Sequence, residues 1–409
     1  MEKIYKREDY LKKIRGFYND DMIKVISGIR RCGKSFFLKS IIQELIENGV
    51  KEKDIIYIEL DKKKYKNIKT SKQLEKIIDE QIVDNDFKYL FIDEIQNVKG
   101  FETLINSYRE EGNISIFITG SNSYLLSGEL VTKLTGRYLE IEMMTLSFYE
   151  YVDMKRFLNK SVNENIYLEF EEYIRNGGFP KSLYYDNYEE KITYTSSVIN
   201  QIFEKDIKTS NRINDKALFE RIQKFVINNF GAVISIKNIY NYLKKEVKIN
   251  VDRRTIKRYL DILEKAKIIY PCELFDIKSK SVLKGEKKYY LADLSIYYSQ
   301  NTDNRINYGP VLENVMYSYL KSKNYKLSVG YIGKLECDFI ARANYDDYYY
   351  IQVSKDISNK ETEEREYRPF YMIKDLYPRY LFTMDMLLQK RDGVKHQNIV
   401  DFIYNNKML

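Results

Sequence analysis

The residues from 28 to 35 have the types and spacing that bind phosphate. They read Gly-Ile-Arg-Arg-Cys-Gly-Lys-Ser and match the pattern G-x-x-x-x-G-K-[ST] at every fixed position. In such a loop, backbone N–H groups at the start of a helix cradle phosphates, the lysine reaches the terminal phosphates and the serine hydroxyl binds Mg²⁺. An ordinary glycine-containing turn is the alternative. We expect ATP and Mg²⁺ here, with contacts from Gly28, Ile29, Arg30, Arg31, Cys32, Gly33, Lys34, Ser35 and Phe36.

Two adjacent acids follow an apolar run about sixty residues later. The segment Tyr-Leu-Phe-Ile-Asp-Glu predicts a buried strand that ends in Asp93 and Glu94. Adjacent residues of a strand point to opposite sides, so the two acids are expected to have different roles. We assign Asp93, with Ser35, to Mg²⁺ and Glu94 to activation of the attacking water as general base, which makes Lys34 and Glu94 catalytic candidates.

Two further segments could complete this site. A strand over 114–120 leads into Thr119-Gly120-Ser121-Asn122, where a polar side chain could contact the terminal phosphate or its water. The sequence does not decide which residue does so, and turn capping is the alternative; Ser121 is our candidate. Arg137 precedes the next strand, where it could enter a neighbouring subunit's site as a catalytic arginine finger or simply form a surface ion pair.

The elements that must position these residues read as an α/β domain over residues 1–145. Short β-rich runs alternate with amphipathic segments, which is typical of a parallel sheet with crossover helices. We expect strands at 23–27, 55–60, 89–93, 114–120 and 138–142, and helices near 34–48, 71–83, 101–111 and 124–134.

Three further domains are expected after residue 145. Residues 146–212 read as a small helical lid with helices at 148–158, 165–176 and 189–207, interrupted by Gly-Gly-Phe-Pro at 177–180. Residues 213–295 read as a winged helix-turn-helix, with helices at 216–229, 236–245 and 252–266 and strands at 268–277 and 287–291. Residues 296–409 read as an α/β domain with helices at 311–323 and 367–376 and strands at 326–332, 338–341 and 348–353.

Basic residues crowd the start of the third helix of the predicted winged helix. A recognition helix enters DNA with its first turns, so we expect DNA contacts from Arg253, Arg254, Lys257 and Arg258. The predicted wing adds Lys278, Lys280, Lys284, Lys287 and Lys288. A winged helix that contacts only protein is the alternative.

The last domain has the layout of a restriction-endonuclease-like fold, with Glu313 on a helix and Asp338 at a strand start. A nuclease of this kind also needs an acid on the next strand and a lysine two residues beyond it. Gln352 and Ser354 occupy these positions, and Lys355 points to the opposite face. We therefore expect an inactive, binding or structural version of the fold; an ATP-gated nuclease is the less favoured alternative.

Taken together, the segments SGIRRCGKS, FIDEIQ, ITGSN and TGRYLEIEM resemble those of bacterial and archaeal AAA+-type P-loop ATPases that carry a conserved C-terminal domain of unknown function. The resemblance covers essentially the whole chain. It implies ATP, Mg²⁺ and a homo-oligomer, and it places the arginine finger just before the fifth strand, where Arg137 lies. DNA binding or remodelling driven by hydrolysis is our leading interpretation, by analogy with other AAA+ proteins that carry a winged helix. A nucleotide-controlled protein-interaction switch in defence or toxin control is the alternative.

Composition excludes several other classes. The chain has 409 residues, 44% hydrophobic and 31% charged, with a formal net charge of +8, which permits nucleic-acid binding without demanding it. A single histidine, His396, argues against His-based catalysis, and three scattered cysteines argue against zinc fingers and disulfides. No stretch is long and apolar enough to suggest a signal peptide or membrane span, so we expect a cytoplasmic protein with no membrane partner.

Overall fold

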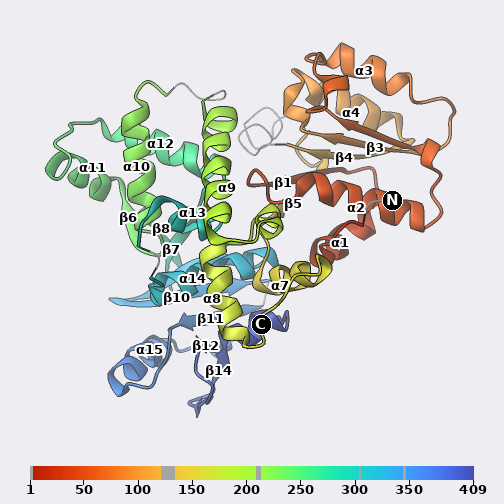
Figure 1. Cartoon of the computed structure of the whole chain (residues 1–409). Coiled ribbons are helices and arrows are strands. Elements are labelled where there is room, and N and C mark those ends of the chain that lie inside the picture. The colour runs from red at the N-terminus through yellow and green to blue at the C-terminus, as the bar shows by residue number, and fades with distance from the viewer. Residues whose placement is uncertain (1–2, 121–133, 209–212, 304, 344–346) are drawn as a thin grey trace. The chain divides into compact units, whose positions relative to one another are not determined.

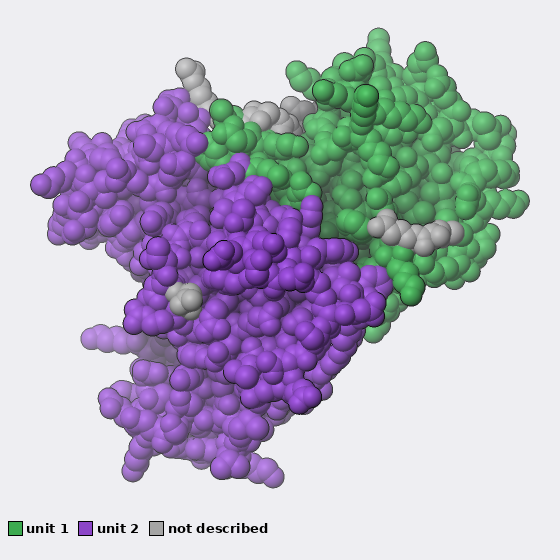
Figure 2. Space-filling view, in the orientation of Figure 1, with its two compact units in different colours: residues 1–143, 201–210 green, residues 144–200, 211–409 purple. Residues whose placement is uncertain are grey.

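The computed structural model describes residues 3–120, 134–208, 213–303, 305–343 and 347–409. Within this range the chain forms two compact units (Figure 2). The first unit consists of residues 1–143 and 201–210, and the second of residues 144–200 and 211–409. Each unit is built on a sheet of its own.

The first unit contains a five-stranded parallel sheet with the strand order β2-β3-β4-β1-β5 (Figure 1). Its strands are β1 (Ile23–Gly28), β2 (Ile55–Glu59), β3 (Lys88–Asp93), β4 (Ile114–Thr119) and β5 (Tyr138–Met143). Its described α-helices are α1 (Glu8–Ile14), α2 (Lys34–Glu47), α3 (Ser71–Asp79) and α4 (Phe101–Glu111). Every residue of β1, β3 and β4 is buried, as a parallel sheet covered on both faces requires. The predicted parallel sheet is confirmed; the helix expected over 124–134 lies almost wholly outside the described residues.

The strand order brings three loops to one edge of this sheet. β1 lies between β4 and β5, and β4 also pairs with β3. The carboxyl ends of parallel strands share one edge, so the segments that follow β1, β3 and β4 begin side by side. These segments start at Gly28, Asp93 and Thr119, which is where the sequence places its polar candidates.

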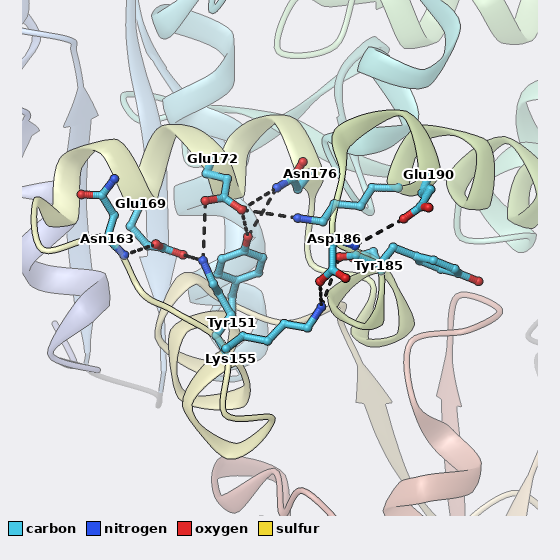
Figure 3. A network of polar contacts seen from close by, with 12 residues as sticks. Tyr151, Lys155, Asn163, Glu169, Glu172, Asn176, Tyr185, Asp186 and Glu190 are labelled. Carbon is cyan, nitrogen blue, oxygen red and sulfur yellow. Dashed lines mark hydrogen bonds and ion pairs between the residues drawn. The ribbon is translucent and has the colours of Figure 1, made fainter.

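The second unit begins with helices that a buried ionic network holds together. They are α7 (Phe148–Phe157), α8 (Ile166–Asn176) and α9 (Tyr188–Gln201), of which the last residue belongs to the first unit. Lys155 of α7 lies 2.5 Å from the Glu169 carboxylate of α8, and their side chains are 9% and 0% exposed. Figure 3 shows how Glu172 connects this pair to Tyr151 and Asn176. Lys191 of α9 also lies 3.4 Å from the Glu172 carboxylate. The helix predicted over 189–207 differs from the structure, because after Gln201 the chain continues as a π-helix over Ile202–Ile207.

The helix α8 ends at Gly177, where the backbone leaves the helical conformation, and neither this glycine nor the next has room for a side chain. Gly177 has φ +73°, and an added Cβ would lie 1.8 Å from the Asp293 carboxylate. A Cβ on Gly178 would lie 2.2 Å from the backbone oxygen of Leu146. Gly178 also donates its N–H to the Asp293 carboxylate, and its backbone oxygen accepts the N–H of Leu146. Two segments of the chain are therefore in direct backbone contact here.

The middle of the second unit contains three helices followed by a hairpin, in the predicted order. These elements are α10 (Lys216–Asn228), β6 (Val233–Ser235), α11 (Ile236–Lys245), α12 (Arg253–Lys265), β7 (Ile269–Asp276), β8 (Ser281–Leu291) and α13 (Ser295–Gln300). The assignment as a winged helix remains a prediction, since this element order alone does not establish it.

One nine-stranded sheet continues from this hairpin into the C-terminal region, in the order β13-β14-β12-β11-β10-β9-β7-β8-β6. The link is a parallel pairing of β7 with β9, through Leu274 and Val329. The remaining elements are α14 (Tyr308–Ser322), β9 (Lys326–Ile332), β10 (Leu335–Arg342), β11 (Tyr348–Val353), α15 (Lys360–Met372), β12 (Arg379–Thr383), β13 (Lys390–Arg391), β14 (Val394–Asn398) and α16 (Ile399–Tyr404). The division of the chain into four domains remains a prediction.

The last helix that the sequence predicted differs from the observed helix α15. The sequence favoured 367–376, whereas α15 begins at Lys360 and ends at Met372. The Asn359 side chain caps its start by accepting the N–H of Glu361, and Leu376 is fully exposed beyond its end. No helix in the described part of the chain is both long and apolar enough to cross a membrane.

Candidate nucleotide-binding site

The loop between β1 and α2 has the backbone of a phosphate cradle. Gly28, Arg31 and Gly33 have φ values of +138°, +71° and +109°. A Cβ on Gly28 would lie 2.3 Å from the Met143 carbonyl oxygen and 2.9 Å from the Cys32 sulfur, so only glycine fits there. Alternation of left- and right-handed backbone turns successive N–H groups toward one point, which suits an anion.

The loop holds its lysine by neutral groups. Lys34 is 6% exposed, and its ammonium group donates to the backbone oxygens of Gly28 at 2.9 Å and Ile29 at 3.2 Å. Carbonyl oxygens solvate the ammonium group without neutralising it. Lys34 therefore offers a full positive charge to an anion in the loop.

The buried acid at the end of β3 faces the start of α2. Asp93 is 6% exposed and accepts hydrogen bonds from the hydroxyl groups of Thr119 and Ser35. Burial raises the pKa of the Asp93 carboxyl, and the two hydroxyl groups oppose this shift. A buried carboxylate beside a serine hydroxyl is a ligand set that suits Mg²⁺, so the residues present fit this ion.

Glu94 leaves the strand in a different direction from Asp93. Its φ and ψ are +60° and +46°, a left-handed conformation that costs a non-glycine residue about 1–3 kcal/mol. The Thr119 hydroxyl accepts the Glu94 N–H at 3.0 Å, and the Glu94 carboxylate accepts a hydrogen bond from the Gln96 amide. The side chain is half-buried, so it is open to solvent where Asp93 is not.

The sequence did not reveal the roles of Thr119 and Gln96. Thr119 is fully buried and joins the two acids through one hydroxyl group. The sequence showed only that this threonine ends an apolar run; the sheet order, which places β4 next to β3, comes from the structure. Ser121, the predicted polar contact, lies outside the described residues.

The other loop residues predicted to contact nucleotide differ in how exposed their side chains are. The side chains of Ile29 and Cys32 are buried in the protein, so only their backbone can face a ligand. Phe36 is 53% exposed. Arg30 is paired with Asp206, and Arg31 donates to Gln201; the sequence predicted neither partner.

Arg137 lies at the opposite edge of the sheet from the phosphate loop. Its backbone oxygen accepts the N–H of Ile23, at the start of β1, whereas the loop follows the end of β1. The side chain is 44% exposed, with Asn106 at 3.2 Å and Glu110 at 4.0 Å. Arg137 is therefore no part of its own chain's site, which leaves both a role in a neighbour's site and a surface ion pair open.

The predicted DNA-contacting residues share one exposed surface. Arg253, Arg254, Lys257 and Arg258 are all exposed on α12, whose opposite side is buried through Ile256, Tyr259, Leu260 and Leu263. The hairpin contributes exposed Lys278, Lys280 and Lys284.

The structure corrects the prediction for two of the wing lysines, which are not exposed as DNA contact would require. Lys288 is 4% exposed and its ammonium group lies 2.9 Å from Glu313 and 2.5 Å from Glu336, so it is not available to DNA. It belongs to the last four residues of β8, which are all buried. Lys287 is half-buried and pairs with Glu273 at 3.0 Å.

Polar residues of the predicted nuclease-like site do meet at one open pocket of about 350 Å³, lined in part by Glu313, Asp338 and Ser354. Lys355 also lines this pocket, so the expectation that it points to the opposite face was wrong. Asp338 accepts the Val353 N–H at 2.7 Å. Gln352 bridges the Asp338 N–H and the Glu366 carboxylate at 2.7 and 2.9 Å. The carboxylates of Asp338 and Glu366 therefore already accept hydrogen bonds from other groups of the protein.

Comparisons with known proteins agree with this picture. Residues 20–152 match a family described as an AAA domain, and residues 167–305 match a domain of unknown function. An uncharacterized protein of Haemophilus influenzae is 34% identical over 400 residues, which cover 97% of this chain and 98% of that protein. An uncharacterized protein of Methanocaldococcus jannaschii is 30% identical over 371 residues, 87% of this chain and 79% of that protein.

Among solved structures, a Walker-type ATPase of Pyrococcus abyssi is similar to the chain with a TM-score of 0.50 and 17% identity, over 72% of this chain and 94% of that one. At this identity the likeness concerns the fold. The nuclease-like assignment of the C-terminal region remains a prediction.

Proposed function

The chain belongs to the same protein family as these Haemophilus and Methanocaldococcus relatives, with an AAA domain in its N-terminal unit, and we propose that it is a Mg²⁺-dependent ATPase of AAA+ type. The observation that carries the proposal is the meeting of Lys34, Ser35, Asp93 and Glu94 at one edge of the sheet. Their charges and burial suit different tasks, as nucleotide hydrolysis requires.

In this proposal each residue has a separate role. Lys34 neutralises the terminal phosphates, and the N–H groups of the loop from Gly28 to Ser35 orient them. Ser35 and Asp93 hold Mg²⁺, which when bound offsets charge on the phosphate oxygens. Glu94 orients a water molecule and takes its proton, for which a half-exposed carboxylate is better placed than buried Asp93.

Two substitutions separate binding from hydrolysis. Lys34→Ala should abolish tight ATP binding, because it removes the ammonium group inside the loop. Glu94→Gln should retain binding and lose turnover by about 10²–10⁴. Glu111→Gln makes the same change at an exposed residue of α4 and serves as the control. Hydrolysis by Glu94→Gln at the parental rate would show that the base is misassigned.

We further propose that the ATPase forms a homo-oligomer and couples hydrolysis to DNA binding or remodelling. The support for DNA is the exposed basic surface of α12, formed by Arg253, Arg254, Lys257 and Arg258, with the three exposed lysines of the hairpin. Changing Arg253, Arg254 and Lys257 together to Ala should lower the salt dependence of DNA affinity by about one unit per lost phosphate contact.

A triple substitution of Lys360, Lys374 and Lys390 to Ala is the matched control, because these lysines are also exposed but lie elsewhere on the second unit. If both triple variants bind DNA like the parent, and DNA leaves ATP hydrolysis unchanged, the basic surface serves protein contacts instead. That result would favour the nucleotide-controlled interaction switch.

The pocket at Glu313 and Asp338 supports a non-catalytic role for the C-terminal region. Lys288 already supplies the countercharge that a divalent cation would bring to Glu313. Incubation of labelled DNA with the protein, ATP and Mg²⁺ or Mn²⁺ tests this reading, and cutting that depends on Asp338 would restore the ATP-gated nuclease.

A further inference from the structure

The phosphate loop is contacted by a segment that is remote in sequence. Residues 201–210 belong to the first unit, although the chain before and after them belongs to the second (Figure 2). The segment forms a π-helix over Ile202–Ile207, in which Ile202, Phe203 and Ile207 are buried. π-Helices are rare and frequently mark functional positions.

The contact is made by Arg30 and Arg31, two consecutive residues at positions that the phosphate-loop pattern leaves open. Arg30 donates from Nε and Nη2 to the two carboxylate oxygens of Asp206 at 2.9 and 2.7 Å. This bidentate pair is mostly buried, with side chains 12% and 6% exposed. Arg31 donates to the Gln201 amide oxygen at 3.1 Å in a more exposed contact.

Acidic groups act on Arg30 from more than one segment of the first unit. Burial lowers the pKa of Arg30, but Asp206, and after it Glu94 and Asp61, outweigh that effect and the pKa is raised overall. A guanidinium group in such surroundings is a bidentate partner for phosphate oxygens. The Asp206 carboxylate, in contrast, is an anion held at the rim of a loop built for anions, and nucleotide phosphates repel it.

We infer that Arg30 is a second phosphate-binding cation of this site, and that the Asp206 carboxylate competes for it with the terminal phosphate of ATP. The inference rests on the proposed function. In the nucleotide-free protein, Asp206 holds Arg30 and with it the segment 201–207. Binding of ATP transfers Arg30 to the terminal phosphate and loosens this segment. ADP, which lacks that phosphate, leaves the pair intact.

Competition predicts that removing the charge of Asp206 strengthens ATP binding. For Asp206→Asn we expect the affinity for a non-hydrolysable ATP analogue with Mg²⁺ to rise about tenfold, within the usual 5–150-fold range of coupling between sites, and the affinity for ADP to change much less. Isothermal titration calorimetry measures both. Glu204→Gln removes the same charge from the same segment, at a residue 52% exposed and paired with Lys208, and should change neither affinity.

Hydrogen exchange in the unmodified protein gives a second readout that needs no variant to fold. Peptides covering 202–207 should exchange faster after addition of the analogue and keep their rate with ADP. Unchanged or weaker analogue binding by Asp206→Asn, or slower exchange of 202–207 with the analogue, would overturn the competition. Absence of nucleotide binding by the unmodified protein would instead refute the proposed function itself.

Discussion

The buried pair of Lys155 and Glu169 offers a measurable test of how the helices of the second unit are held together. The Glu169 side chain is fully buried, and it accepts both the Lys155 ammonium at 2.5 Å and the Asn163 N–H at 2.7 Å. Glu169→Gln keeps the size and one oxygen acceptor but removes the charge. Lys155 is then left buried with Glu172 as its remaining carboxylate partner, at 3.5 Å.

The expected loss follows from burial. Removing one partner of a buried ion pair lowers the free energy of unfolding by about 3–5 kcal/mol. Because Glu172 remains as a partner of Lys155, we expect a loss near the lower end of this range. Glu172→Gln makes the same chemical change at a side chain 40% exposed, where about 1 kcal/mol or less is expected. A loss of about 3 kcal/mol corresponds to exchange of protected amides that is faster by about 10².

Hydrogen exchange measured by mass spectrometry is the suitable assay, because peptides of α7 and α8 report on these helices separately from the first unit. The double substitution Lys155→Met with Glu169→Leu should recover most of the protection, since it leaves no buried charge unpaired. Equal effects of Glu169→Gln and Glu172→Gln would refute the argument from burial.

Three further predictions concern other parts of the chain. Mixing Arg137→Ala with Lys34→Ala protein should restore ATP hydrolysis that each lacks alone if Arg137 acts in a neighbour's site; activity equal to the sum of the two, with subunit exchange demonstrated, would exclude this. Gly178→Ala should lower stability by about 1–3 kcal/mol in urea denaturation because its Cβ would meet the Leu146 backbone oxygen at 2.2 Å, whereas Gly309→Ala, with nothing within 4 Å, should not. Burial lowers the pKa of His396 below its usual 6.5, so the unfolded chain binds this proton first and stability falls as the pH drops below about 6.5. An NMR titration of the imidazole signal of this single histidine measures its pKa in the folded protein. A value of 6.5 or more would contradict the prediction.

The regular elements of the first unit were predictable because their signals are local. Apolar runs such as Tyr89–Ile92 mark strands that are buried on both faces, and the glycines and lysine of the phosphate loop are fixed within eight residues. The adjacent acids Asp93 and Glu94 were assigned different tasks from strand alternation alone. The structure adds that a left-handed turn at Glu94 separates them further.

In the C-terminal region the local signals were weaker. The strands β12 and β14 and the helix α16 were not predicted, and α15 was placed too late because its start depends on the cap at Asn359. Lys288 looked like one more wing lysine in a basic run. Its burial depends on Glu313 and Glu336, which lie far along the chain.

The sequence by itself determined the phosphate loop, its Mg²⁺-binding and base candidates and the parallel sheet, since each depends on residue types at short spacing. Only the tertiary structure decided which distant side chains meet them. Thr119 joins Asp93 to Glu94 because β4 lies next to β3, and Asp206 reaches Arg30 from 176 residues away. Such pairs depend on how the elements pack. The residues next to a carboxylate in an amphipathic segment do not indicate which distant side chain it will contact.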